Sequence, residues 1–139
     1  MEAADAETFL GENTKGVLIT LRADGRPQSS NIAYSFADGV ARISVTDTRA
    51  KTANLRRDGR AVLHVIGEDS WYQYVSASGT AELTPLTTTP GDDTGKELLE
   101  VYNAVAGEPH PDPDEFYQAM VDDKRLAVRF RPDSYAGMV

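Results

Sequence analysis

Short runs of alternating apolar and polar residues recur along the chain, and turn-forming pairs separate several of them. Alternation of this kind is typical of half-buried strands. The runs predict strands at residues 15–22, 27–36, 40–45, 60–66, 71–83 and 124–131. Asp24-Gly25 and Asp38-Gly39 stand between the first three runs and favour tight hairpins. The first run is apolar enough to predict cover on both faces, and Gly79 predicts a bulge in the fifth.

Other segments have a helical period instead. Apolar residues recur at helical spacing in residues 3–13, 93–105 and 114–121. A further short helix is predicted to begin after Thr48, with Thr48 or Asp47 as its N-cap, and to end near Asp58. The order of elements predicts a mainly β chain with helices, of the α+β class. It has roughly six antiparallel strands in a small barrel and three or four short helices, in one domain over residues 1–139.

Composition and charge limit which binding partners, cross-links and cellular locations are expected. The chain has a net charge of -8 and no cysteine. Its acidity argues against nucleic acid as a partner, and the absence of cysteine excludes disulfides and thiolate metal sites. No run approaches the ~20 apolar residues of a membrane helix, and residues 1–5 do not resemble a signal peptide. We therefore expect a cytoplasmic protein with no membrane partner.

One segment departs from this acidity. It holds five of the 14 Lys and Arg residues, namely Arg49, Lys51, Arg56, Arg57 and Arg60. Arg49 and Lys51 fall at the predicted N-terminus of the short helix, where free backbone N–H groups already favour an anion. This arrangement suits a phosphate. A solvated basic helix without a ligand is the other interpretation of the charge pattern.

Common catalytic motifs are absent from the sequence. There is no dinucleotide-binding glycine motif, no P-loop and no zinc-protease motif. The only histidines are His64 and His110, for which we expect structural roles. The carboxylates show no metal-ligand spacing, so no metal site and no catalytic side chain are assigned. An enzyme with this sequence would depend on a cofactor for its chemistry.

Several motifs resemble the pyridoxamine 5'-phosphate oxidase-like split β-barrel superfamily, known for binding FMN. The closer resemblance is to its actinobacterial branch of oxidoreductases that use the deazaflavin coenzyme F420. The motifs span nearly the whole chain: residues 16–20, 24–28, 30–31, 49–52, 54–58, 71–72, 79–83 and 117–121. The most specific part is Arg49-Ala50-Lys51-Thr52, followed by Asn54-Leu55.

The resemblance implies a homodimer with cofactor sites at the subunit interface. Arg49 and Lys51 match the basic pair that holds the cofactor phosphate. Other matching positions lie near the phosphate (Thr52, Asn54) or line the cofactor (Gln28, Ser30, Asn31, Ser44, Thr46). Trp71, with Tyr72, would come from a later strand of the same or the partner subunit. Simple packing is the alternative role for Trp71 and Tyr72, and edge-strand polarity is the alternative for Gln28 and Asn31.

The function implied is a reductase that transfers a hydride from reduced coenzyme F420 to an organic acceptor. Two alternatives share the site: an FMN-dependent oxidase or reductase, and a flavin- or deazaflavin-binding protein without turnover. A structural dimer without cofactor is a fourth possibility. Arg56, Arg57 or Arg60 would meet the anionic glutamate tail of the deazaflavin. Neither the acceptor nor a proton donor is identified by the sequence.

Overall fold

The computed structural model describes all 139 residues. The chain forms one seven-stranded sheet and four helices, in which every paired strand is antiparallel. In chain order these are α1 (Ala3–Glu12), β1 (Lys15–Leu21), β2 (Pro27–Ala33), β3 (Ser35–Ala37), β4 (Val40–Thr46), α2 (Ala50–Arg57), β5 (Arg60–Ile66), β6 (Tyr74–Leu83), α3 (Asp93–Ala106), α4 (Pro113–Asp122) and β7 (Arg125–Met138). The predicted α+β class and split barrel are confirmed.

The two edges of the sheet are consecutive in the chain. The strand order is β2-β1-β5-β6-β7-β4-β3, and only Tyr34 separates β2 from β3. The β1–β2 ladder ends at Ala33, although the N–H of Tyr34 still donates to the carbonyl of Thr14 at 2.8 Å in the same register. The ring of Tyr34 is buried, and its hydroxyl donates to the carbonyl of Leu10 at 2.8 Å. The run predicted as one strand is therefore two, and the sheet curls until its edges meet.

Alternating residues fill the inside of the curled sheet. Leu18, Leu63 and Val65 on neighbouring strands are fully buried, as are Val128 and Phe130 on β7. The helix α1 adds its apolar face, Ala6, Phe9 and Leu10, to this core. The strand alternation in the sequence thus correctly indicates which side chains form the core.

The outer face of β1 and β5 is apolar but only half-buried. Val17, Ile19 and Leu21 on β1, with Val62 and Ile66 on β5, point away from the core and remain partly exposed. The prediction that β1 is covered on both faces is therefore not met within one chain. Neighbouring exposed apolar side chains on a sheet face are typical of an interaction surface.

The strand β6 begins at Tyr74, so the prediction that it begins at Trp71 is wrong. Trp71 and Tyr72 lie in a turn and are 75% and 79% exposed. The turn closes because the N–H of Gly67 donates to the carbonyl of Gln73 at 2.8 Å. Packing in the core of this chain is thus excluded as the role of either aromatic residue.

The bulge predicted at Gly79 is present. The register of β6 against β7 shifts between Ser78 and Gly79, where Gly79 faces Pro132. A Cβ on Gly79 would lie 2.1 Å from the carbonyl oxygen of Arg131, so only glycine fits. Because Pro132 lies opposite this irregularity, β7 passes through it and runs well beyond its predicted end at residue 131.

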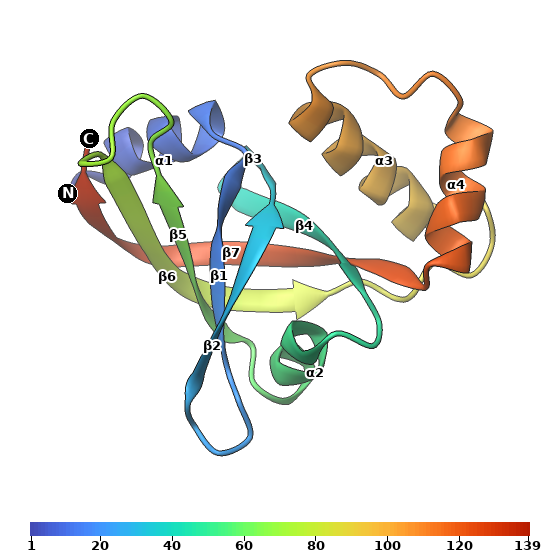
Figure 1. The fold of residues 1–139 in the computed structure, drawn as a ribbon, viewed down its shortest axis with the longest axis horizontal. Helices are drawn as coiled ribbons and strands as arrows, with labels where there is room; N and C mark the ends of the chain where they lie inside the picture. The colour runs from blue at the N-terminus through green and yellow to red at the C-terminus, as the bar shows by residue number, and fades with distance from the viewer.

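The helices α3 and α4 are inserted between β6 and β7. Figure 1 shows them together at one side of the barrel, away from the two chain termini. Asp92 caps α3 by accepting from the N–H of Gly95 at 2.8 Å. No helix in the structure combines the length and the apolar character that crossing a membrane requires.

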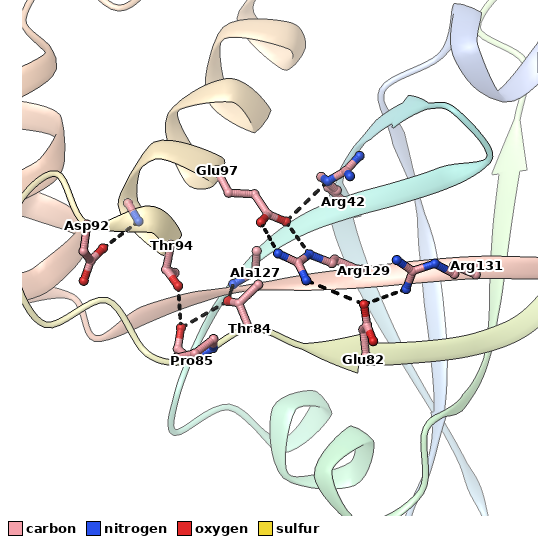
Figure 2. A network of polar contacts seen from close by, with 11 residues as sticks. Arg42, Glu82, Thr84, Pro85, Asp92, Thr94, Glu97, Ala127, Arg129 and Arg131 are labelled. Carbon is pink, nitrogen blue, oxygen red and sulfur yellow. Dashed lines mark hydrogen bonds and ion pairs between the residues drawn. The ribbon is translucent and has the colours of Figure 1, made fainter.

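A polar network fixes α3 to the barrel (Figure 2). Glu97 accepts hydrogen bonds from Arg129 at 2.6 and 2.9 Å and forms an ion pair with Arg42 at 3.3 Å. The hydroxyl of Thr94 donates to the carbonyl of Pro85 at 2.9 Å. The hydrogen bond from Arg129 is the main cause of a lowered pKa for Glu97. The inserted helices are thus held by charged contacts as well as by apolar packing.

Candidate functional site

A cavity of about 390 Å³ opens between β2, β4, the start of β7 and the start of α2. Its walls are formed by Asn31, Ile32, Ala33, Ser44, Val45, Thr46, Arg49, Lys51 and Arg125. The cavity brings together five of the residues proposed from the sequence, namely Asn31, Ser44, Thr46, Arg49 and Lys51. It adds Arg125, which the sequence analysis did not identify. Three cationic side chains therefore line one hollow in a protein of net charge -8.

The helix α2 begins at this cavity without a side-chain cap. Its N-cap residue is Arg49, so the predicted caps Thr48 and Asp47 are wrong. The carboxylate of Asp47 instead pairs with Arg56 at 2.5 Å. The hydroxyl of Thr52 donates back to the carbonyl of Thr46 at 2.7 Å. The N–H groups of the first turn consequently have no side-chain acceptor, which favours an external anion.

The basic segment divides into paired and unpaired cations. Arg56 pairs with Asp47, and Arg60 pairs with Asp58 at 2.7 Å. Arg57 donates to the carbonyl of Leu21 at 3.1 Å and to Asn54 Oδ1 at 2.8 Å. In contrast, the side chains of Arg49 and Lys51 form no hydrogen bond or ion pair within the chain.

The two unpaired cations and Arg125 act on one another. Burial lowers the pKa of the Lys51 ammonium, and the charges of Arg49 and Arg125 lower it further. Arg125 Nη1 donates to Ser44 Oγ at 3.3 Å, but its buried Nε has no hydrogen-bond partner and lies 3.6 Å from Asp123 Oδ2. Gathering three like charges with only one carboxylate, that of Asp123, close to them costs free energy. A bound anion would remove this cost, and a phosphate would also accept from the unpaired N–H groups.

Three of the proposed residues hold the elements around the cavity in place and do not line it. Buried Asn54 donates to Thr20 Oγ1 at 3.1 Å and to Gln28 Oε1 at 3.0 Å, which ties α2 to the β1–β2 hairpin. Thr52 is fully buried under the start of α2. The side-chain amides of Asn54 and Gln28 and the hydroxyl of Thr52 thus have partners within the chain and do not line the cavity.

The remaining two proposed residues lie elsewhere. Ser30 is half-buried on β2, on the same face of the strand as Gln28. Trp71 lies in the exposed turn before β6. Neither contributes to the walls of the cation-lined cavity in one chain.

Arg125 reaches the cavity through strand pairing. It is the first residue of β7 and lies opposite Thr46, the last residue of β4. No motif near residue 125 marks it in the sequence. The sequence does show a cation at the start of the last strand. This cation points to the cavity only when the β4–β7 register is known, because that register places Arg125 opposite Thr46.

The histidines are placed apart from this cavity. His64 is half-buried on the outer face of β5, with its ring 5.5 Å from that of Tyr74. His110 lies in the loop between α3 and α4, where its Nδ1 accepts from the N–H of Asp112 at 3.0 Å. Neither histidine lines the cation-lined cavity.

Fold and cavity together define a split β-barrel protein with a cation-lined cavity beside the edge of its sheet. Residues 3–137 match the sequence profile of the pyridoxamine 5'-phosphate oxidase family. The chain belongs to this family.

Solved structures agree with this placement. A protein described as an F420 reductase is 25% identical, with a TM-score of 0.71 and 94% of each chain covered. The conserved hypothetical protein Rv2991 of Mycobacterium tuberculosis is 23% identical, with a TM-score of 0.78 over 99% of this chain and 84% of its own. An FAD-binding protein of Mesorhizobium loti is 16% identical, with a TM-score of 0.69 over 99% of this chain and 92% of its own. The last two likenesses concern the fold alone.

Proposed function

We propose that this protein is an oxidoreductase that binds coenzyme F420 and delivers a hydride from its reduced form to an organic acceptor. The observation that carries the proposal is the cavity lined by Arg49, Lys51 and Arg125 at the uncapped start of α2. The likeness to an F420 reductase supports the deazaflavin over FMN. Both cofactors carry a phosphate, so the cationic cavity alone suits either.

The residues of the cavity have separate tasks in this proposal. Arg49 and Arg125 offer paired N–H donors to the phosphate, and Lys51 adds a compact charge. Asn31, Ser44 and Thr46 offer polar groups to the edge of a ring system. The bound deazaflavin would supply the hydride chemistry.

The remaining proposed residues would act around the cavity. Asn54, Gln28 and Thr52 hold α2 and β2 in place, so that the cations stay in position without contacting the cofactor. Ser30 lies on β2 one residue from Asn31 and would help to fix that strand. Arg56, Arg57 and Arg60 would have to exchange their internal partners to meet the glutamate tail.

A second copy of the chain completes the site in this proposal. The apolar outer face of β1 and β5 has no cover within one chain, and burying it would stabilise a homodimer. The exposed Trp71 and Tyr72 lie in the turn between β5 and β6, a few residues after Ile66 at the end of this face. An aromatic side chain in such a position would contact the partner and the cofactor held there.

Steady-state oxidation of reduced coenzyme F420 tests the proposal. We expect turnover with conjugated organic acceptors and loss of turnover in Lys51→Ala, with the fold retained by circular dichroism. Tight binding of the deazaflavin without oxidation by any acceptor would establish a carrier rather than a reductase. Turnover with reduced FMN and not with reduced F420 would establish the flavin alternative.

A further inference from the structure

A second, apolar cavity adjoins the cation-lined one. Its volume is about 320 Å³, and seven of its nine lining residues are hydrophobic. The lining is Ala33, Ser44, Leu98, Val101, Tyr102, Val105, Phe116, Met120 and Arg125. Ala33, Ser44 and Arg125 also line the cation-lined cavity, so the two cavities adjoin at these three residues.

The apolar cavity lies between the barrel and the inserted helices. Leu98 and Val101 on α3 and Phe116 on α4 are buried at its wall. At its mouth the rings of Tyr102 and Phe116 lie 5.4 Å apart, and His110 lies 5.0 Å from Tyr102. Glu97 pairs with Arg129 and Arg42 and fixes α3 on the strands, as Figure 2 shows. The cavity is therefore preformed, as small-molecule sites usually are.

Arg125 is the only charged residue in the lining. Its buried Nε has no hydrogen-bond acceptor and only a 3.6 Å ion pair with Asp123, and its Nη1 makes a long hydrogen bond to Ser44 Oγ. No second cation is present to bind a phosphate, and no carboxylate is present to bind an amine. A ligand that matches this lining has an apolar body and a single carboxylate or carbonyl head.

We propose that this cavity is the acceptor site, and that the acceptor is an apolar molecule with one carboxylate or carbonyl head that contacts Arg125. The role as acceptor site rests on the proposed function, because it assumes that the adjoining cavity holds the cofactor. The volume lies within the range of small-ligand pockets and is too small for a docked helix. Ala33, Ser44 and Arg125 line both cavities and would place the two ligands next to each other. A single cation in the lining suits a singly charged or neutral head better than a phosphate.

Binding of two fluorescent probes tests the site without any cofactor. The probes are 8-anilino-1-naphthalenesulfonate, which has an apolar body and one anionic head, and its uncharged counterpart N-phenyl-1-naphthylamine. We expect the native protein to bind the anionic probe more tightly. Val105→Trp should weaken binding of both probes at least tenfold because its ring fills the cavity. The matched control Ala106→Trp, on the exposed surface beside it, should change binding less than twofold.

Two further variants locate the probe head. Arg125→Met should abolish the preference for the anionic probe. Lys51→Ala should leave probe affinity within twofold, because Lys51 lines only the cation-lined cavity. Loss of probe binding in Lys51→Ala but not in Val105→Trp would overturn the proposal, as it would place the probe with the cofactor phosphate. Near-ultraviolet circular dichroism confirms that each variant is folded.

Cofactor titrations of the same variants separate this proposal from the function. Val105→Trp should bind coenzyme F420 as the native protein does, while its turnover with acceptors falls. Absence of cofactor binding in the native protein would defeat the proposed function and the acceptor role, whatever the probe result. Cofactor binding combined with unchanged turnover in Val105→Trp would defeat the acceptor site alone.

Discussion

The guanidinium of Arg125 lies 3.3 Å from the hydroxyl of Ser44, although 81 residues separate them in the chain. The antiparallel register of β4 and β7 brings them together, because Thr46 pairs with Arg125 and Ser44 pairs with Ala127. This contact stands where the cation-lined and the apolar cavities meet. Arg125 can therefore contact both the proposed cofactor and the proposed acceptor.

Replacing Arg125 should weaken cofactor binding without weakening the fold. Arg125→Met removes a charged partner of the phosphate, and hydrogen bonds to charged groups contribute about 1.5–3 kcal/mol. We expect affinity for coenzyme F420 to fall by about tenfold or more. The free energy of unfolding should change little, because the loss of like-charge repulsion with Lys51 offsets the loss of the contacts to Ser44 and Asp123. The control Arg131→Met removes another arginine of β7, which pairs with Glu82, and should leave cofactor affinity unchanged.

Replacing Glu97 should loosen α3. Glu97→Gln leaves Arg129 and Arg42 without their carboxylate and should cost about 1–3 kcal/mol at pH 7, measured by urea unfolding. The exposed neighbour Glu100→Gln is the matched control. The hydrogen bond from Arg129 holds the pKa of Glu97 below its ordinary value of 4.5.

The loss of unfolding free energy in Glu97→Gln should depend on pH in one direction. A lowered pKa means that the stabilisation from Glu97 is fully present above pH 4.5 and is lost as the pH falls through the folded-state value. The difference between native protein and Glu97→Gln should therefore shrink as the pH is lowered below 4.5. A difference that stays constant with pH would show that the ion pair does not contribute.

Asn54 should matter more for stability than for the cofactor. Asn54→Ala leaves Thr20 and Gln28 without their shared donor in the interior and should cost about 1–3 kcal/mol. Lys51→Ala should give the reverse result, with a large loss of affinity and little change in unfolding. If Asn54→Ala and Lys51→Ala lost cofactor affinity equally and neither lost stability, Asn54 would be a direct contact of the cofactor.

These cases separate what the sequence can predict from what it cannot. Strand alternation predicted the core, because Leu18 or Val65 must face inward at a fixed period. The basic segment predicted Arg49 and Lys51, because cations at a helix start are unusual. Arg125 depends on the register of distant strands, which no local pattern encodes.

Two other predictions, the N-cap of α2 and the single strand over residues 27–36, were wrong because contacts with distant residues competed with the local pattern. Aspartate is a good N-cap residue, but the carboxylate of Asp47 pairs with Arg56 in the last turn of α2. Tyr34 continues the alternation of β2, but the chain changes its partner strand at this residue, from β1 before it to β4 after it. In both cases a tertiary contact overrides a correct local propensity.

The apolar outer face gives a prediction about assembly. Ile19→Glu places a charge on the half-buried strip of β1, opposite Val62. We expect light scattering to show a dimer for the native protein and a monomer for this variant, with cofactor affinity reduced because the site lies at the interface. Ala119→Glu on the exposed face of α4 is the control. A native protein that is monomeric at micromolar concentration would refute the interface.

Fluorescence titration of the purified protein with oxidised coenzyme F420, and separately with FMN, tests the central claim most directly. The account predicts micromolar or tighter binding of the deazaflavin, weaker binding of FMN, and at least tenfold weaker binding of the deazaflavin in folded Lys51→Ala. Binding of neither cofactor, or unchanged affinity in Lys51→Ala, would contradict it, because the three cations of the cavity, Arg49, Lys51 and Arg125, would then bind no phosphate.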